Sequence, residues 1–275
     1  MCASRRGVSV HDHARWVFNR LARDYLARPG YPEALVARLL ALAADLGGPG
    51  PAGGPGAQPV LAPLRVVDLG AGTGHLAIPL AASGALVHAV EPAREMLRAL
   101  EDQAVSTAPA AAGRIVPVHA AAEDTGLPAA SFDLAVVADA LHWIDADRGG
   151  AEIARLLAPG GVLAVVEPRL AETPFLAALR DRIARANFKA RPAPPPVEYL
   201  FAVALGAVPA EERFWHEVAL DGAALSSVLR SLSYVGPAIG PAAIAALVDD
   251  ARALARAHGG AVWRRDIRLA WARHG

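Results

Sequence analysis

The central part of the chain alternates between short apolar runs and longer amphipathic stretches. Apolar runs occupy residues 64–69, 86–90, 115–119, 133–138 and 162–167, and stretches with helical spacing occupy 74–83, 93–104 and 149–158. The runs predict buried strands, and the stretches between them predict helices. Their regular alternation favours a doubly wound, Rossmann-like α/β sheet, which we expect to have its core at residues 60–168. Pro159-Gly160-Gly161 predicts a helix end and a tight turn into the fifth strand.

The residues before this core predict a separate helical segment. Apolar positions recur at helical spacing over 12–27 and over 33–46, and the sequence Arg28-Pro-Gly-Tyr-Pro32 separates these two helices. We expect residues 1–46 to form a helical lid on the sheet. Residues 47–59, which are rich in glycine and proline, predict a flexible surface loop between this lid and the core.

The pattern changes again after the fifth strand. Residues 170–190 have helical spacing and Arg191–Pro196 is a proline-rich, extended connector, so we expect 169–212 to form a cap insertion over the site. Further strands are predicted at 213–220 and 262–271, and further helices at 224–232 and 241–257. We therefore expect residues 213–275 to complete a single domain with a seven-stranded, mostly parallel sheet and an antiparallel last strand.

The end of the first strand carries the most informative motif. Residues 66–75 read Val-Val-Asp-Leu-Gly-Ala-Gly-Thr-Gly-His, so that Gly70, Gly72 and Gly74 follow Asp68. Glycines let the backbone turn tightly while a ligand lies against it. The dinucleotide fingerprint G-x-G-x-x-G would need a third glycine where His75 stands, which argues against an NAD-dependent dehydrogenase. The Asp68 carboxylate would meet a cationic or hydrogen-donating group of the ligand.

The later strand ends add groups that suit a nucleoside. In an open α/β sheet the ligand lies beyond the carboxyl ends of the strands, so these ends are expected to face one pocket. Glu91 ends the second strand, and a carboxylate there can accept hydrogen bonds from the two ribose hydroxyls of a nucleoside, that of NAD included. Glu123 and Asp124 follow the third strand, where acids also serve simply as turn residues.

The glycine loop with Asp68 resembles motif I of the class I S-adenosylmethionine (SAM)-dependent methyltransferases. The segment Phe18–Pro32 and the segment Ala140–Asp145, which reads Ala-Leu-His-Trp-Ile-Asp, are similar to small-molecule methyltransferases related to the trans-aconitate methyltransferase group. The resemblance spans about residues 16–168. It implies an enzyme that uses SAM as its cofactor and a small molecule as methyl acceptor.

The resemblance also implies a set of cofactor contacts. It brings Tyr25 and Arg28 near the SAM carboxylate, where an arginine can make a two-point contact, although both could equally pack a helix end on the sheet. The resemblance also implies that Met96 packs on the adenine ring. Many members of the family have Asp where Ala121 stands. In this chain the adenine edge is therefore expected to contact the backbone of Ala122 and the side chain of either Glu123 or Asp124. The full predicted set is Tyr25, Arg28, Asp68, Gly70, Gly72, Gly74, Glu91, Pro92, Met96, Ala122, Glu123, Asp124 and Asp139.

The acceptor half of the site is predicted from fewer signals. Methyl transfer is an in-line displacement, so the protein must mainly position the acceptor and exclude water. A carboxylate attacks directly, whereas a phenol, alcohol or amine must lose a proton, for which His142 is the candidate base. His142 and Trp143 could equally be packing at a strand end. Tyr31, Trp143 and Arg169 are the predicted substrate contacts, and O-methylation is favoured over N- or C-methylation.

The composition of the chain limits the kinds of partner that it is expected to bind. Lys plus Arg and Asp plus Glu both number 27, so the chain lacks the positive field of a nucleic-acid-binding protein. It also has Asp139-Ala-Leu-His142 where nucleic-acid methyltransferases carry an Asn/Asp-Pro-Pro-Tyr-like tetrapeptide. Cys2, the only cysteine, allows no intrachain disulfide and fits a reducing cytoplasm. Apolar runs are too short to span a membrane, so we expect no membrane partner.

Two further expectations concern metals and alternatives. The histidines and acids show no metal-ligand spacing, so no metal is predicted. The main alternative function is a protein with the SAM fold but without methyl transfer, such as a cyclase or a binding protein. A nucleic-acid methyltransferase is the next alternative.

Overall fold

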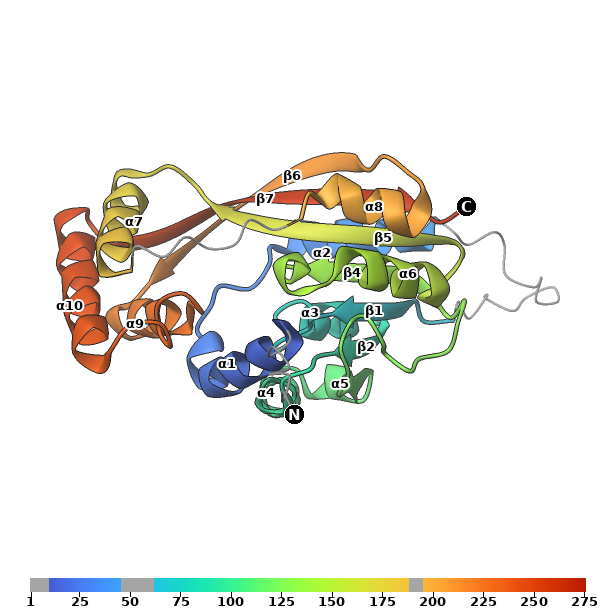
Figure 1. Ribbon diagram of the computed structural model, residues 1–275, viewed down its shortest axis with the longest axis horizontal. Helices are drawn as coiled ribbons and strands as arrows, with labels where there is room; N and C mark the ends of the chain where they lie inside the picture. Colours follow the sequence, from blue (N-terminus) through green and yellow to red (C-terminus); the bar gives the residue numbers. More distant parts are fainter. Residues whose placement is uncertain (1–9, 46–61, 188–194) are drawn as a thin grey trace, which may run out of the picture.

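A computed structural model of the protein describes residues 10–45, 62–187 and 195–275, and its centre is one seven-stranded sheet in the order β3-β2-β1-β4-β5-β7-β6 (Figure 1). The strands are β1 (Arg65–Leu69), β2 (Leu86–Val90), β3 (Ile115–Val118), β4 (Phe132–Ala138), β5 (Leu157–Leu170), β6 (Ala210–Leu220) and β7 (Ala261–Arg273). The first five pair in parallel, and β7 runs antiparallel to both β5 and β6. The predicted mostly parallel sheet with an antiparallel last strand is confirmed.

The helices of the described residues cover both faces of this sheet and one end of it. They are α1 (Val10–Tyr25), α2 (Glu33–Ala44), α3 (Ala77–Ala82), α4 (Arg94–Thr107), α5 (Pro109–Ala112), η1 (Leu141–Trp143), α6 (Ala146–Leu156), α7 (Pro174–Ala186), α8 (Val197–Leu205), α9 (Gly222–Ser231) and α10 (Pro241–Ala257). Sequence periodicity missed α5, η1 and α8. The predicted loop 47–59, most of the connector 191–196 and Cys2 lie outside the described residues. No described helix is long and apolar enough to cross a membrane.

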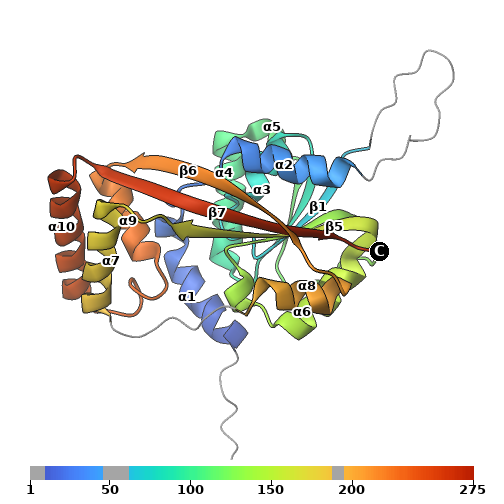
Figure 2. The same ribbon diagram turned by 90° about the horizontal axis from the view of Figure 1, so that it is seen from above.

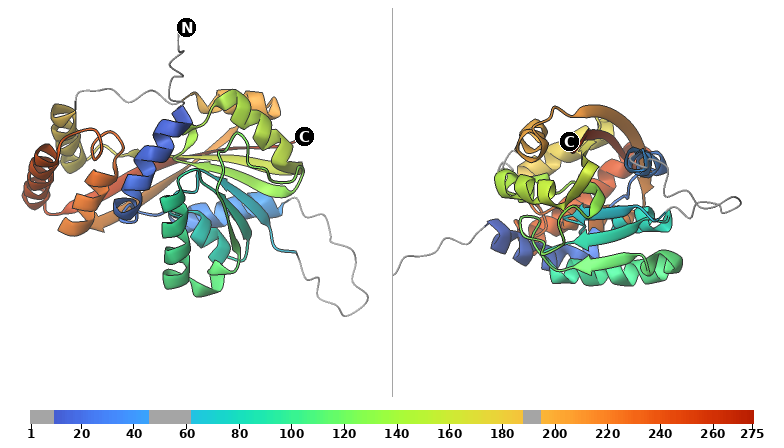
Figure 3. Two further views of the ribbon diagram at one scale, coloured as in Figure 1. Left: turned by 60° about the horizontal axis from the view of Figure 1, so that its bottom comes forward. Right: turned by 90° about the vertical axis from the view of Figure 1, so that its right-hand side faces the viewer.

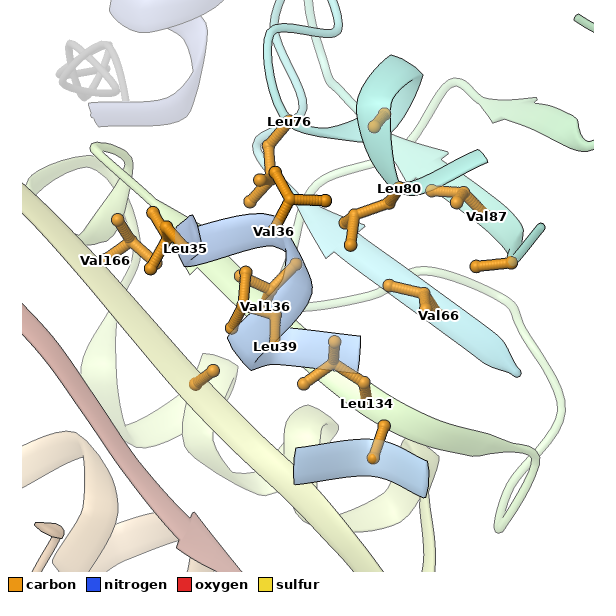
Figure 4. Packing of buried hydrophobic residues seen from close by; sticks show 14 of the residues in the cluster. Leu35, Val36, Leu39, Val66, Leu76, Leu80, Val87, Leu134, Val136 and Val166 are labelled. Atoms are coloured by element: carbon orange, nitrogen blue, oxygen red, sulfur yellow. The ribbon is translucent and has the colours of Figure 1, made fainter. Parts of the chain in front are cut away.

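Successive residues of the central strands are buried on opposite faces, because helices cover both sides of the sheet. On one face Val66 of β1 and Leu134 of β4 pack against Leu39 of α2 and Leu80 of α3 (Figure 4). On the other face Val67 and its neighbours pack against α6 and α8, in a second cluster of fully buried side chains. This double burial explains why the strands are continuous apolar runs in the sequence.

The fifth strand is longer than its apolar run predicts. Residues Pro159-Gly160-Gly161 lie inside β5, and the preceding helix already ends at Leu156. Gly160 has a φ of +79°, and the pairing of β4 with β5 shifts register between Phe132 and Leu134. The predicted turn is therefore a local irregularity within a paired strand, since a bulge absorbs the extra residues without ending the ladder.

Strands β5, β6 and β7 continue past the rest of the sheet and carry a separate group of helices (Figures 1 and 2). Helices α7, α9 and α10 pack together at the far end of these strands around a third apolar cluster, which includes Phe175, Leu229, Leu247 and Trp263. We call these three helices, together with the ends of the strands that carry them, the cap. Helix α1 lies between this cap and the core, in contact with α9 on one side and with α4 on the other (Figure 3).

The cap differs from the predicted insertion at residues 169–212. Helix α7 of that segment joins the cap, but α8 packs against α6 on the core. Helices α9 and α10, which were expected to flank the sheet within residues 213–275, belong to the cap instead. The reason is the position of the buried residues: Leu200 and Phe201 of α8 face the core cluster, whereas Leu225 and Val228 of α9 face α7 and α10.

Candidate active site

The loop after β1 requires glycine for steric reasons. Gly70 and Gly74 have φ angles of +80° and +85°, a region that other residues rarely adopt. A Cβ atom at Gly70 would lie 2.6 Å from the Cβ of Ala140, and one at Gly74 would lie 2.7 Å from the Cγ of Leu100. The loop therefore packs its backbone directly against α4 and against Ala140, in the segment that follows β4.

Glu91 at the end of β2 holds this loop in place. Its Oε2 accepts a hydrogen bond from the Gly72 amide at 3.1 Å, and its Oε1 accepts one from the Ala93 amide at 2.8 Å. Burial raises the pKa of Glu91 to about 7, against the effect of the two amides. Each carboxylate oxygen can accept a second hydrogen bond, so Glu91 can also bind a pair of hydroxyl groups.

Asp68 lies under the loop with an unsatisfied oxygen. The residue is only 1% exposed, and its Oδ1 has no hydrogen-bond partner among the described residues. Burial, with a contribution from the charge of Glu91, raises the pKa of Asp68 to about 7. A buried polar atom without a partner is costly, so a cationic hydrogen-bond donor on a ligand would stabilise this carboxylate.

A first pocket opens at the carboxyl ends of β1, β2 and β4 and collects most of the predicted cofactor residues. It is lined by Tyr25, Arg28, Gly70, Gly72, Glu91, Pro92, Met96, Ala122, Glu123 and Asp139, together with His142 and Trp143. Asp68, Gly74 and Asp124 do not line it. Of the two acids left open by the sequence, Glu123 is buried and accepts a hydrogen bond from the Asp145 amide at 2.7 Å, whereas Asp124 is exposed.

Aromatic side chains close one wall of the first pocket. Phe18 of α1 makes edge-to-face contacts with Trp143 and Tyr25, with ring centroids 5.2 and 6.1 Å apart, and His142 lies 5.2 Å from Trp143. Phe18 was not among the predicted site residues. Its signal was present, because it belongs to the apolar positions at helical spacing in the first predicted helix.

Arg28 joins the lid to the cap. Its Nη1 donates to the Tyr25 hydroxyl at 3.1 Å and lies 3.5 Å from Asp139 Oδ2, while Nε and Nη2 donate to the side chain and carbonyl of Ser231 at 2.9 and 3.0 Å. Asp139, at the end of β4, has a φ of +50°, a strained conformation of the kind that collects at functional sites. Ser231 belongs to α9, which the sequence did not connect to the site.

A second pocket, with a volume of about 460 Å³, lies between the core and the cap. It shares Tyr25, Arg28 and Asp139 with the first pocket, so the two are adjacent. The remaining lining residues are Pro29, Tyr31, His75, Pro168, Arg169, Leu170, Arg180, Val228, Leu232, Tyr234, Trp263 and Arg265. Of the predicted substrate contacts, Tyr31 and Arg169 therefore lie in the second pocket, whereas Trp143 lies in the first.

His75 lines the second pocket, although sequence reasoning used it only to exclude a dinucleotide. Its Nδ1 lies 3.0 Å from the Thr73 hydroxyl, and its ring lies 5.9 Å from that of Tyr25. Burial lowers the pKa of His75 to about 4; the carbonyls of Leu26 and Arg28 favour the charged ring but make no hydrogen bond of normal geometry to Nε2. The imidazole is therefore neutral at pH 7, and burial disfavours its protonation.

Tyr31 stays protonated in the same pocket. Its pKa is raised well above the ordinary value, first by burial and then by the negative charge of Asp139. The phenol is thus a hydrogen-bond donor toward a bound ligand. Within residues 10–45, 62–187 and 195–275 there is no cluster of His, Cys, Asp and Glu that could hold a metal ion.

Comparison with known proteins gives a consistent result. A family model described as a methyltransferase domain matches residues 67–165. An uncharacterized methyltransferase of Mycobacterium tuberculosis (strain ATCC 25618 / H37Rv) is 37% identical over 167 residues, which are 60% of this chain and 55% of that protein. The malonyl-[acyl-carrier protein] O-methyltransferase of Geobacter sulfurreducens is 33% identical over 153 residues, which are 54% of this chain and 51% of that protein. The chain thus spans about half the length of the curated relatives it matches.

A solved structure extends the likeness beyond the core. A candidate type II methyltransferase from Anaeromyxobacter dehalogenans superposes with a TM-score of 0.57 and 26% identity, covering 90% of this chain and 97% of that chain. The resemblance to class I SAM-dependent methyltransferases, predicted from the glycine loop, is confirmed by these matches. The narrower trans-aconitate-like group stays a prediction.

Proposed function

We propose that this chain, whose residues 67–165 match a methyltransferase domain model, transfers a methyl group from SAM to a small-molecule acceptor. The observation that carries the proposal is the pair of adjacent pockets. The first contains the glycine loop and Glu91 at the carboxyl ends of the core strands, and the second extends from it under the cap. Such an arrangement suits a donor and an acceptor that meet at the residues common to both, Tyr25, Arg28 and Asp139.

The residues of the first pocket fit SAM along its whole length. Glu91 would accept hydrogen bonds from the ribose hydroxyls, and Met96 with Glu123 would contact the adenine. Asp68 lies beneath the loop with a buried oxygen that lacks a partner, which supports a role in binding the ammonium group. Arg28 and Tyr25 would hold the carboxylate. We assign the adenine contact to Glu123 rather than Asp124, because Asp124 is exposed outside the pocket.

The chemistry needs positioning more than it needs acid or base groups. SAM, when bound, supplies a methyl group on a sulfonium. Phe18 and Trp143 would exclude water from one side of the first pocket, and Tyr31 with Arg169 would orient the acceptor in the second pocket. For a hydroxyl acceptor, His142 would hold the released proton. A carboxylate acceptor requires no base.

O-methylation remains the favoured reaction. The malonyl-[acyl-carrier protein] O-methyltransferase among the relatives supports this choice. We further propose a small-molecule acceptor rather than a nucleic acid, because the formal net charge of the chain is +0.

The test combines calorimetry with mass spectrometry. The full chain is titrated with SAM, S-adenosylhomocysteine (SAH) and NAD, and then incubated with SAM and a panel of carboxylic acids and phenols. We expect SAM and SAH to bind and NAD not to bind, and we expect a product heavier by one methylene together with released SAH. Binding of SAM without any SAH formation would favour the alternative of a binding protein or cyclase, and stronger binding of NAD would overturn the proposal.

A further inference from the structure

One arginine of the second pocket differs from all its neighbours on the same strand. Arg265 is 8% exposed and lines the second pocket, whereas Arg264, Arg268 and Arg273 of β7 are not among its lining residues. Those three each pair with a carboxylate: Arg264 with Glu217 at 2.6 Å, Arg268 with Glu167 at 3.2 Å and Arg273 with Asp45 at 3.7 Å. Arg265 forms no ion pair with any carboxylate in the described part of the chain.

The hydrogen bonds of Arg265 leave much of its guanidinium unsatisfied. Its Nη2 donates to the carbonyl of Gly30 and lies 2.6 Å from Nδ1 of His216. His216 is a neutral acceptor here, because burial and then the charge of Arg265 lower its pKa. The Nε atom is buried and has no hydrogen-bond partner. Two neutral acceptors thus orient the guanidinium without balancing its charge.

The surroundings offer no compensating anion. Burial lowers the pKa of Arg265, and the groups that oppose this effect are Tyr31, which is a neutral phenol, and Asp139. Asp139 is already paired with Arg28 at 3.5 Å, and among the described residues it is the only carboxylate lining the second pocket, which also contains Arg169 and Arg180. A buried charge without a partner is strongly unfavourable, so its presence beside a cavity points to a ligand of opposite charge.

We infer that Arg265 forms an anion-binding subsite in the second pocket and that the acceptor is a small molecule with a carboxylate or phosphate group on an apolar body. Leu170, Val228, Leu232 and Trp263 supply apolar wall, and Tyr31 supplies a phenol donor. The arginine recognises the anionic oxygens. This inference rests on the proposed function, because it names the acceptor class of that same site.

The test compares each anion with its own neutral analogue, so that shape stays constant while charge changes. The full chain is titrated by calorimetry at constant ionic strength with benzoate, 4-hydroxybenzoate and octanoate, each beside its primary amide, and with phenyl phosphate beside phenol. We expect at least one anion to bind ten or more times tighter than its neutral analogue. A preference limited to phenyl phosphate assigns a phosphate monoester, and one limited to the acids assigns a carboxylate. Equal affinities, or no binding by any anion, would overturn the inference.

Variants connect the preference to one side chain. Arg265→Met should abolish the preference for the anion, and Arg264→Met, a matched loss of an arginine on the outer face of the same strand, should leave it unchanged. Arg265→Met should also keep or raise Tm, since apolar replacement of a buried uncompensated charge is neutral or stabilising. If Arg265→Met still bound the anion more tightly than its neutral analogue, the assignment of the subsite to Arg265 would be wrong. The comparison of acids with amides in the unaltered chain tests the subsite even if the variant does not fold.

A cofactor titration separates this inference from the proposed function. SAH should bind Arg265→Met and the unaltered chain with the same affinity. Loss of SAH binding in Arg265→Met with unchanged anion binding would move Arg265 to the cofactor site and overturn the subsite. Failure of the unaltered chain to bind SAH, with the anion preference intact, would instead overturn only the proposed function.

Discussion

The two halves of the site contain buried charges of opposite sign. On the core side, Asp68 and Glu91 are buried acids with pKa values raised to about 7, and Asp68 has an oxygen without a partner. On the cap side, Arg265 is a buried cation without a carboxylate partner in the described chain. Each half is thus incomplete in a way that a ligand of opposite charge would correct. The cationic donor suits the core, and an anionic acceptor suits the cap.

The difference also shows how each half obtains its geometry. The core half is built by a local loop in which Gly70 packs against Ala140 with no room for a side chain. The cap half is built by the pairing of long strands, which sets Arg265 opposite Leu170 in the β5–β7 ladder. Substitutions in the core half should therefore act on the donor, those in the cap half on the acceptor, and those in the link between them on both.

The largest effect is expected at Gly70. The substitution Gly70→Ala combines a positive φ with a Cβ contact of 2.6 Å, and the two costs together amount to about 2 to 5 kcal/mol of unfolding free energy. We also expect it to abolish SAH binding. Urea unfolding and calorimetry measure both effects. Gly84→Ala is the control, because Gly84 has a φ of +102° but nothing within 4 Å of an added Cβ, so its cost is confined to the conformational part.

Glu91 should give the next largest effect, confined to the donor. The substitution Glu91→Gln removes a charged acceptor for two hydroxyls and is expected to weaken SAH binding about 10- to 100-fold. Binding of the anionic probes to the second pocket should not change. The exposed Glu95→Gln on α4 serves as the control. If Glu91→Gln weakened the binding of SAH and of the anionic probes equally, the division of the site into two independent halves would be wrong.

Asp68 should make the stability of the ligand-free protein depend on pH. Its pKa rises from 3.8 unfolded to about 7 folded, so the stability linked to its protonation is complete below pH 3.8 and is lost as pH rises toward 7. The pKa of Glu91 rises in the same way, from 4.5 in the unfolded chain to about 7 in the folded protein, so Glu91 changes stability in the same direction. Asp68→Asn should flatten this decline, measured by urea unfolding from pH 4 to pH 8, while weakening SAH binding. A decline as steep as in the unaltered chain would contradict the role of Asp68.

The smallest effect is expected at the link between the halves. Ser231→Ala removes the hydroxyl that accepts from Arg28 Nε at 2.9 Å, a bond worth about 1 kcal/mol. Because Arg28 lines both pockets, SAH and the anionic probe should each bind several-fold more weakly. Ser227→Ala on the same helix contacts Arg230 rather than Arg28 and should leave both affinities unchanged. An effect on one ligand alone would assign Arg28 to that half only.

The position of the core half in the fold could be predicted from the sequence, because its signals are local. Gly70, Glu91 and Asp139 stand at the ends of strands whose apolar runs are visible in the sequence, and the carboxyl ends of parallel strands meet at one edge. Tyr25 and Arg28 were predicted in another way, from the resemblance of the N-terminal segment to small-molecule methyltransferases. The sequence left open whether Glu123 or Asp124 contacts adenine, because the exposure of neighbouring turn residues depends on the backbone of the turn and not on the hydrophobic pattern.

The cap half could not be predicted from the sequence, because its geometry depends on residues that lie far apart along the chain. Arg265 lies in a run that reads only as a late strand, and whether it faces a pocket depends on how far β5 and β7 stay paired beyond the core. Likewise, the sequence did not show that α8 packs on α6 while α9 packs on α10 and α1. His75 was read only as the residue that breaks a fingerprint, although it faces the second pocket.

The continuous ladder between core and cap has a mechanical consequence. The pairs of β5 with β7 run without interruption from Val162↔Arg273 in the core to Leu170↔Arg265 at the second pocket. A hinge between the two parts would have to break these hydrogen bonds, so we expect the cap to move little relative to the core and the size of the second pocket to be set in advance. Entry of the donor then depends on α1, which packs on both parts without being paired to the sheet. Hydrogen exchange should accordingly open α1 well before either long strand, and the enzyme would select its acceptor by a preset shape rather than by closing around it.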